Sequence, residues 1–195
     1  MNYPNNIKKN YSKNVNYGNR GMDLENLINI MNERYIENDI AIIYKKPTPI
    51  QVVKYNYDLK RITDAYYMSA STLDYNGVYK GYYIEFDAKN TNLSYLPLSN
   101  IADHQIKHIE RIIKHNGIAF LIIMINGECY LLPGEDLIDF INTQTRKSIP
   151  YDYIKSNGYK LEMNYLRGVD YIDAVEQIIN KRRLCDEKNK NQEKE

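Results

Sequence analysis

The sequence predicts a single α/β domain built on a mixed β-sheet. Its 195 residues are enough for one domain with a substantial hydrophobic core. Helical and strand patterns alternate along the chain, which favours helices packed on a sheet. The continuous apolar run over residues 117–125 predicts a central strand that is buried on both faces. Short turns at Lys80-Gly81 and Asn126-Gly127 predict hairpins beside this strand.

The remaining elements follow from the spacing of apolar residues and from the Gly and Pro positions between them. Helices are expected over residues 21–38, 99–115, 136–142 and 170–182, and strands over 40–45, 50–55, 61–68, 71–79, 82–90, 117–125 and 128–132. Residues 1–18 predict a flexible basic arm and residues 183–195 a polar tail, which leaves residues 19–182 as the folded domain.

Composition and charge exclude several classes of protein. The net charge of +1 gives no overall basic field, although residues 45–61 carry five cations and only one acid. Cys129 and Cys185 lie far apart and match no metal-binding spacing. No signal peptide is recognisable and the longest apolar run is too short to cross a bilayer. We therefore expect a cytoplasmic protein without a membrane partner.

Residues 82–89 carry the first indication of chemistry. Side chains alternate along a strand, so Tyr83, Glu85, Asp87 and Lys89 share one face. Asp87 and Lys89 are then about 7 Å apart along that strand. A charged strand face of this kind is more often solvated than catalytic, so further residues are needed to indicate a site.

The preceding strand supplies an acid. With Lys80-Gly81 as a two-residue turn, Tyr79 pairs with Tyr82, Asp74 faces Asp87, and Thr72 faces Lys89. Directly opposed carboxylates repel each other at a Cβ separation of about 5 Å. Either the register differs, for example through a bulge at Asn76-Gly77, or the two acids form a cation site. A hard divalent cation with oxygen ligands, Mg²⁺ above all, would remove that repulsion.

The helix over residues 99–115 adds an amide. Its apolar stripe is formed by Ile101, Ile109 and Ile112, and Gln105 lies near the centre of that stripe. An amide in this position needs a polar partner. Either Gln105 bonds to backbone inside the core, or it reaches the acidic strands. His104, His108 and His115 are expected to be surface or backbone-bonded residues.

Five short blocks resemble a known family, in the same order along the chain. They are Asn19-Arg20-Gly21-Met22, Lys45-Lys46-Pro47-Thr48-Pro49, Asp74-Tyr75-Asn76-Gly77, Tyr79-Lys80-Gly81 and Asp103-His104-Gln105. With Asp74 and Asp87-Ala88-Lys89, they resemble the RecU-type Holliday junction resolvases, within the restriction-endonuclease-like nuclease superfamily. The resemblance implies a restriction-endonuclease-like mixed β-sheet flanked by helices, with a protruding β-stalk over about residues 45–68.

The resemblance also implies a structure-specific endonuclease that resolves Holliday junctions during homologous recombination and DNA repair. Metal-dependent phosphodiester hydrolysis would use Mg²⁺ or Mn²⁺, held by residues at the positions of Thr72, Asp74, Asp87 and Gln105. Lys89 takes the position of the transition-state-stabilising lysine. The chain has Asp87 where the family usually has Glu, and Glu85 where Asp is usual. Glu85 is a further candidate through an outer-shell water. Glu25, on the first helix, either faces the site as an acid often does in the superfamily, or is a solvated helix charge.

The implied stalk and arm supply candidate DNA contacts. These are Arg20, Lys45, Lys46, Lys54, Lys60, Arg61 and the aromatic pair Tyr66 and Tyr67. The two tyrosines either stack on bases of an opened four-way junction or merely pack the strand. Symmetric cleavage of a junction implies a homodimer, and a recombinase is a further implied partner. Two alternatives remain open: a related nuclease that cuts duplex DNA, and a non-catalytic junction-binding modulator of recombination.

Overall fold

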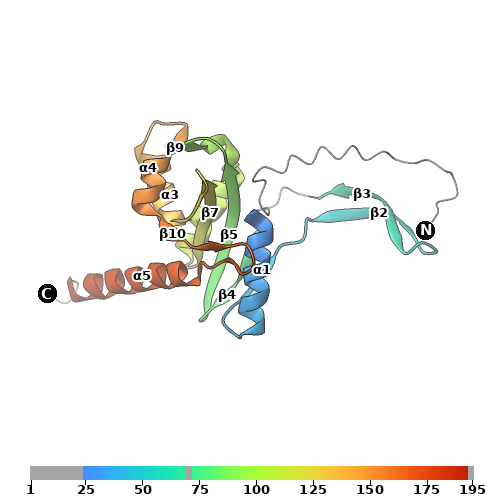
Figure 1. The fold of residues 1–195 in the computed structure, drawn as a ribbon, viewed down its shortest axis with the longest axis horizontal. Helices are drawn as coiled ribbons and strands as arrows, with labels where there is room; N and C mark the ends of the chain where they lie inside the picture. The colour runs from blue at the N-terminus through green and yellow to red at the C-terminus, as the bar shows by residue number, and fades with distance from the viewer. Residues whose placement is uncertain (1–23, 69–71, 193–195) are drawn as a thin grey trace.

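The computed structural model describes residues 24–68 and 72–192. In this part of the chain the body is a six-stranded sheet with helices on both faces (Figure 1). The strands lie in the order β1 (Ile42–Lys45), β4 (Tyr75–Tyr79), β5 (Tyr82–Thr91), β7 (Ile118–Ile125), β8 (Glu128–Pro133) and β10 (Tyr159–Leu161). β5 and β7 are parallel and the other neighbours antiparallel, so the predicted mixed sheet is confirmed.

The helices cover the two faces of the sheet with separate hydrophobic clusters. α1 (Leu24–Glu37) and α5 (Ile172–Gln192) pack on the face that carries Ile84 and Phe86. α2 (Asp103–Lys114), α3 (Gly134–Thr143) and α4 (Tyr151–Asn157) cover the other face. Two parallel neighbours need a crossover, and α2 lies within the connection from β5 to β7. This connection lays α2 over the strand face that carries Glu85 and Asp87.

The two predicted hairpin turns are confirmed by backbone geometry. Lys80 and Gly81 have φ values of 48° and 84°, and Asn126 and Gly127 have values of 52° and 76°. Positive φ at both central residues matches the right-handed twist of the flanking strands. Tyr79 pairs with Tyr82 as expected, which sets the register of β4 and β5.

The expected stalk is a separate two-stranded sheet of β2 (Ile50–Asn56) and β3 (Arg61–Tyr67). Figure 1 shows this hairpin extending away from the six-stranded body. Every residue of the two strands is exposed except the half-buried Asn56. The stalk therefore adds little to the hydrophobic core and presents both of its faces outward.

Several boundaries differ from the sequence-based expectations. The strand expected over 71–79 begins only at Tyr75, and α5 continues to Gln192 instead of ending near 182. Good helix formers without Gly or Pro after Arg182 allow that extension. Not predicted were α4, β10, η1 (Leu98–Asn100) and the short strands β6 (Tyr95–Pro97), β9 (Ser148–Pro150), β11 (Met163–Asn164) and β12 (Gly168–Val169).

The arm over residues 1–18 and Arg20 lie outside the described residues. Among the helices that are described, none combines the length and the apolar character needed to cross a bilayer.

Candidate active site

Two carboxyl groups meet where β4 and β5 lie side by side. Asp87 is on β5 and is 1% exposed. Asp74 directly precedes β4, and the pairing of Tyr75 with Phe86 brings it opposite Asp87 as the predicted register requires. Burial, then the charge of Asp87 and a proton shared with it, raise the pKa of Asp74 to about 6. The pair is therefore a strained acidic site unless a proton or cation lies between its members.

The surroundings of Asp87 leave one oxygen free for such a cation. Oδ2 accepts hydrogen bonds from Lys89 Nζ at 2.8 Å and from Gln105 Nε2 at 2.7 Å. Oδ1 is buried and, within residues 24–68 and 72–192, has no hydrogen-bond partner. A buried carboxylate oxygen without a partner is rare because its desolvation is costly. A divalent cation beside Asp74 would occupy this position.

Gln105 fixes the N-terminus of α2 to the same site. Its Nε2 also donates to the carbonyl of Thr72 at 2.9 Å, while its Oε1 accepts from the Ala102 amide at 3.2 Å. The amide therefore joins the strand acid, the segment before β4 and the first turn of α2. The structure contains both alternatives: Gln105 bonds to backbone at Ala102 and Thr72, and it also reaches the acid on β5.

Thr72 does not face Lys89 as the hairpin register predicted. The chain leaves that register before β4, and Thr72 Oγ1 instead lies 3.1 Å from Glu85 Oε1 and accepts from Lys46 Nζ at 2.7 Å. Thr72 thus contacts a residue four positions before Lys89 on β5, although its carbonyl still accepts from Gln105. Strand pairing alone cannot determine the positions of residues that lie beyond the last paired residue.

Glu85 is the centre of a second polar cluster beside the carboxylate pair. Its side chain is 1% exposed and forms an ion pair with Lys46. It also accepts from Tyr83 Oη at 2.6 Å and lies 2.9 Å from His108 Nε2. Although burial opposes ionisation, the hydrogen bonds from Lys46, Tyr83 and His108 lower the pKa of Glu85. Glu85 is therefore a carboxylate at neutral pH.

This cluster connects the active site with the base of the stalk. Lys46 precedes β2, and its backbone amide donates to the carbonyl of Asp74 at 2.7 Å. Thr72 lies on the segment that returns from β3. Residues at both ends of the stalk, Lys46 and Thr72, therefore contact Glu85 beside Asp74.

His108 was expected on the surface or bonded to backbone, and that prediction is wrong. It lies one helical turn after Gln105 on α2, so the helix directs both side chains to the same strand face. This i, i+3 spacing is the sequence signal that could have identified it.

Glu25 lies in the first turn of α1 and forms an ion pair with Lys45. Its charge contributes to the raised pKa of Asp74, so it is close to the carboxylate pair. The structure therefore places this acid beside the site, while a role in metal binding stays a prediction.

The predicted DNA contacts fall into two groups. Lys45 and Lys46 are engaged with Glu25 and Glu85 at the base of the stalk, while Lys54, Lys60 and Arg61 are exposed on it. Tyr66 and Tyr67 are 60% and 76% exposed, so neither side chain packs the strand. Their rings are accessible to a ligand.

The residues present fit one Mg²⁺ ion better than a metal enclosed by protein ligands. No group of three or more His, Cys, Asp or Glu that could hold a metal occurs in the described part of the chain. Mg²⁺ commonly uses one or two carboxylates, keeps several waters and binds substrate phosphate. Asp74 and Asp87 provide such a partial set. Gln105 turns Nε2 and not its oxygen toward Asp87, and Thr72 Oγ1 contacts Glu85 and Lys46, so metal binding by these two residues stays a prediction.

Comparison with known proteins gives consistent results. Residues 19–177 match the family model described as Recombination protein U. A protein named Holliday junction resolvase RecU from Oceanobacillus iheyensis is 43% identical, over 91% of this chain and 99% of that protein. A relative of the same name from Streptococcus gordonii is 42% identical, over 90% and 94% of the two chains.

A solved structure of Archaeoglobus fulgidus Hjc, a Holliday junction resolvase from an archaeal hyperthermophile, is similar with a TM-score of 0.40 and 11% identity. The similarity covers 68% of this chain and 94% of that one. The family match and the two bacterial relatives extend over most of the chain, including the carboxylate pair, Lys89 and the stalk, so this chain belongs to the Recombination protein U family.

Proposed function

We propose that this protein is a structure-specific endonuclease that resolves four-way DNA junctions by hydrolysing phosphodiester bonds. The observation that carries the proposal is the contact of Asp74 with Asp87, whose Oδ2 accepts from Lys89 and Gln105 while Oδ1 has no partner among the described residues. The relatives with high sequence identity are named Holliday junction resolvases, and their similarity covers the residues of this site and of the stalk. A non-catalytic junction-binding protein would not need the carboxylate pair.

We infer that Asp74 and Asp87 hold Mg²⁺, with Mn²⁺ as an alternative. The ion would supply a bound water of lowered pKa and would offset charge on the scissile phosphate. Gln105 Nε2 donates to Asp87 Oδ2 and to the Thr72 carbonyl, so these two residues would position Asp87 and help to orient the waters around the ion. Gln105 and Lys89 also keep Asp87 Oδ2 occupied, which directs Oδ1 to the cation position.

Lys89 is the residue that would contact the substrate phosphate. Its side chain is 16% exposed and Nζ donates to Asp87 Oδ2 at 2.8 Å, so the ammonium group lies beside the carboxylate pair. A fixed positive charge there stabilises the negative charge that develops during phosphodiester cleavage.

The stalk supports both junction binding and a homodimer. Its apolar side chains, among them Val53, Tyr55 and Ile62, are 52%, 44% and 45% exposed. An isolated two-stranded hairpin is only marginally stable in water, so contact with DNA or a second copy would stabilise it. Two cuts on opposed strands require two active sites related by a two-fold axis. A recombinase partner and a cytoplasmic location stay predictions.

The proposal is tested with a synthetic four-way junction and a linear duplex of the same sequence. We expect symmetric nicking of the junction with Mg²⁺ or Mn²⁺ and none with EDTA. Asp87→Asn should reduce cleavage at least about 100-fold while junction binding persists. The matched control is Asp139→Asn, which removes an exposed carboxylate on α3.

Each alternative has its own outcome in this experiment. Equal cleavage rates on junction and duplex would identify a duplex nuclease of the same superfamily. Tight junction binding without cleavage under any metal would identify a non-catalytic modulator. Unchanged cleavage by Asp87→Asn would show that the proposed active site is wrong.

A further inference from the structure

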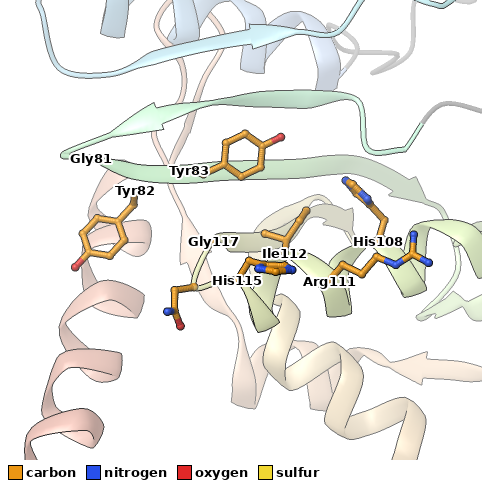
Figure 2. A pocket seen from close by; sticks show the side chains of 9 residues that line it. Gly81, Tyr82, Tyr83, His108, Arg111, Ile112, His115 and Gly117 are labelled. Atoms are coloured by element: carbon orange, nitrogen blue, oxygen red, sulfur yellow. The ribbon is translucent and has the colours of Figure 1, made fainter.

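A groove beside the active site has features that the carboxylate pair does not explain. It has a volume of about 840 Å³ and lies between β5 and the C-terminal half of α2. Figure 2 shows His108, Arg111 and His115 on the helix and Tyr82 and Tyr83 on the strand. His108 also contacts Glu85, so the groove continues from the polar cluster of the active site.

The charge of the groove has a single sign. The described residues that line it include one guanidinium and two imidazoles and no carboxylate. Arg111 is exposed and forms no ion pair with any residue in the ranges 24–68 and 72–192. At about 100° per residue, His108, Arg111 and His115 lie on one flank of α2, and the helix's acids, Asp103 and Glu110, lie more than about 100° from its centre. The flank of α2 that faces the groove therefore carries N–H donors and no acid.

The distance between the groove and the metal-site residues is short enough for one nucleic acid strand to contact both. Tyr83 precedes Asp87 by four residues on β5, which is about 13 Å, and Arg111 follows Gln105 by six residues on α2, which is about 9 Å. Phosphates of one strand advance about 3.4 Å per nucleotide along a duplex axis. The groove thus lies about three to four nucleotides from a phosphate bound at Asp87.

We propose that this groove binds the sugar-phosphate backbone of the DNA strand being cut, with Arg111 contacting a phosphate three to four nucleotides from the scissile bond. This inference rests on the proposed function and adds a contact apart from the stalk. His115 and the imidazole of His108 supply further N–H donors, and Tyr82 and Tyr83 line the groove from β5.

A different explanation for Arg111 follows from its place in the last turn of α2. Cations near a helix C-terminus stabilise the helix by about 0.3–1 kcal/mol through its dipole. Such a role would affect thermal stability and leave DNA affinity unchanged. The two explanations therefore differ in a measurable property.

The test measures the affinity of the full-length protein for a four-way junction in EDTA, where cleavage cannot interfere. Arg111→Ala should weaken binding about tenfold at physiological salt. It should also reduce the slope of log affinity against log salt concentration by about 0.9, the value for one lost phosphate contact. His115→Ala serves as a second variant. Arg34→Ala is the matched control because Arg34 is exposed on α1, on the opposite face of the sheet.

The contact is located with junctions that carry one neutral methylphosphonate linkage at successive positions. A neutral linkage three to four nucleotides from the cut should weaken binding of the wild-type protein and leave Arg111→Ala unaffected. The proposal is wrong if Arg111→Ala binds like wild type, loses only thermal stability, or responds to every methylphosphonate as wild type does. An equal effect of Arg34→Ala would also overturn it.

The outcomes separate this proposal from the proposed function. If the wild-type protein neither binds nor cuts junctions, both fail. If it cuts junctions and Arg111→Ala binds normally, only the groove proposal fails.

Discussion

Replacing Asp74 by Asn should make the metal-free protein more stable at pH 8 while removing its metal-dependent activity. In the folded protein, burial and the nearby charge of Asp87 raise the pKa of Asp74 from 3.8 to about 6. Ionising Asp74 therefore costs more in the folded than in the unfolded state. Asn keeps the shape of the side chain and removes the charge.

The size of the effect follows from this shift. About two pKa units correspond to an upper limit of about 3 kcal/mol. Asp74 is half-buried, and solvent screening reduces the expected gain to about 1–2 kcal/mol. For a chain of this length, that gain raises Tm by about 2–8 °C.

The pH dependence has a defined direction. Between pH 3.8 and about 6 the folded state binds more protons at Asp74 than the unfolded state does. The contribution of Asp74 to the free energy of unfolding of the wild-type protein therefore falls as pH rises through that window. Above the window, the folded protein bears the full cost of ionising Asp74. The advantage of Asp74→Asn should be largest at pH 7–8 and vanish below about pH 4.

Thermal unfolding across pH in EDTA measures this difference, with Asp139→Asn as the control. Added Mg²⁺ should raise the Tm of the wild-type protein by mass action and leave Asp74→Asn nearly unchanged. The reasoning is refuted if Asp74→Asn is less stable than wild type at pH 8, or if the Tm difference does not depend on pH.

Three further predictions concern neighbouring parts of the molecule. Glu85→Gln should destabilise the protein by about 1–3 kcal/mol at pH 7, because Lys46 and His108 lose a charged partner. Since the folded state lowers the pKa of Glu85, this difference should shrink as pH falls below 4.5 and be lost once pH is below the lowered folded-state pKa; denaturant unfolding should give a smaller difference at pH 4 than at pH 7. Lys89→Met should reduce junction cleavage about 100-fold or more in single-turnover assays without weakening junction binding, and wild-type rates would exclude its assigned role. Tyr67→Ala should weaken junction binding about 5- to 100-fold while Tm changes little, because its ring is 76% exposed. An unchanged junction affinity in gel-shift titrations would exclude stacking by this ring.

Most of the fold could be predicted from local sequence patterns. The buried run of β7 and the two-residue turns at Lys80-Gly81 and Asn126-Gly127 established the centre of the sheet and its hairpins. Strands of two or three residues, such as β10 and β12, were missed because they are too short to show a period. Their positions depend on pairing with residues that are distant in sequence.

Part of the candidate site, like part of the fold, could also be predicted from local sequence patterns. Strand alternation and the turn register place Asp74 opposite Asp87 and put Lys89 on the same face, since these relations depend only on backbone geometry. The helical period likewise indicates that Gln105 faces the sheet. The carboxylate pair was therefore determined by the sequence itself.

Only the tertiary structure decided what surrounds that pair. The crossover lays α2 along β5, which brings His108 to Glu85 and opens the groove at Arg111. Folding also returns both ends of the stalk to Glu85, so Lys46 points inward and Thr72 leaves the expected register. These contacts join segments without a shared secondary-structure period, and they form only when the sheet and its crossover helix pack together.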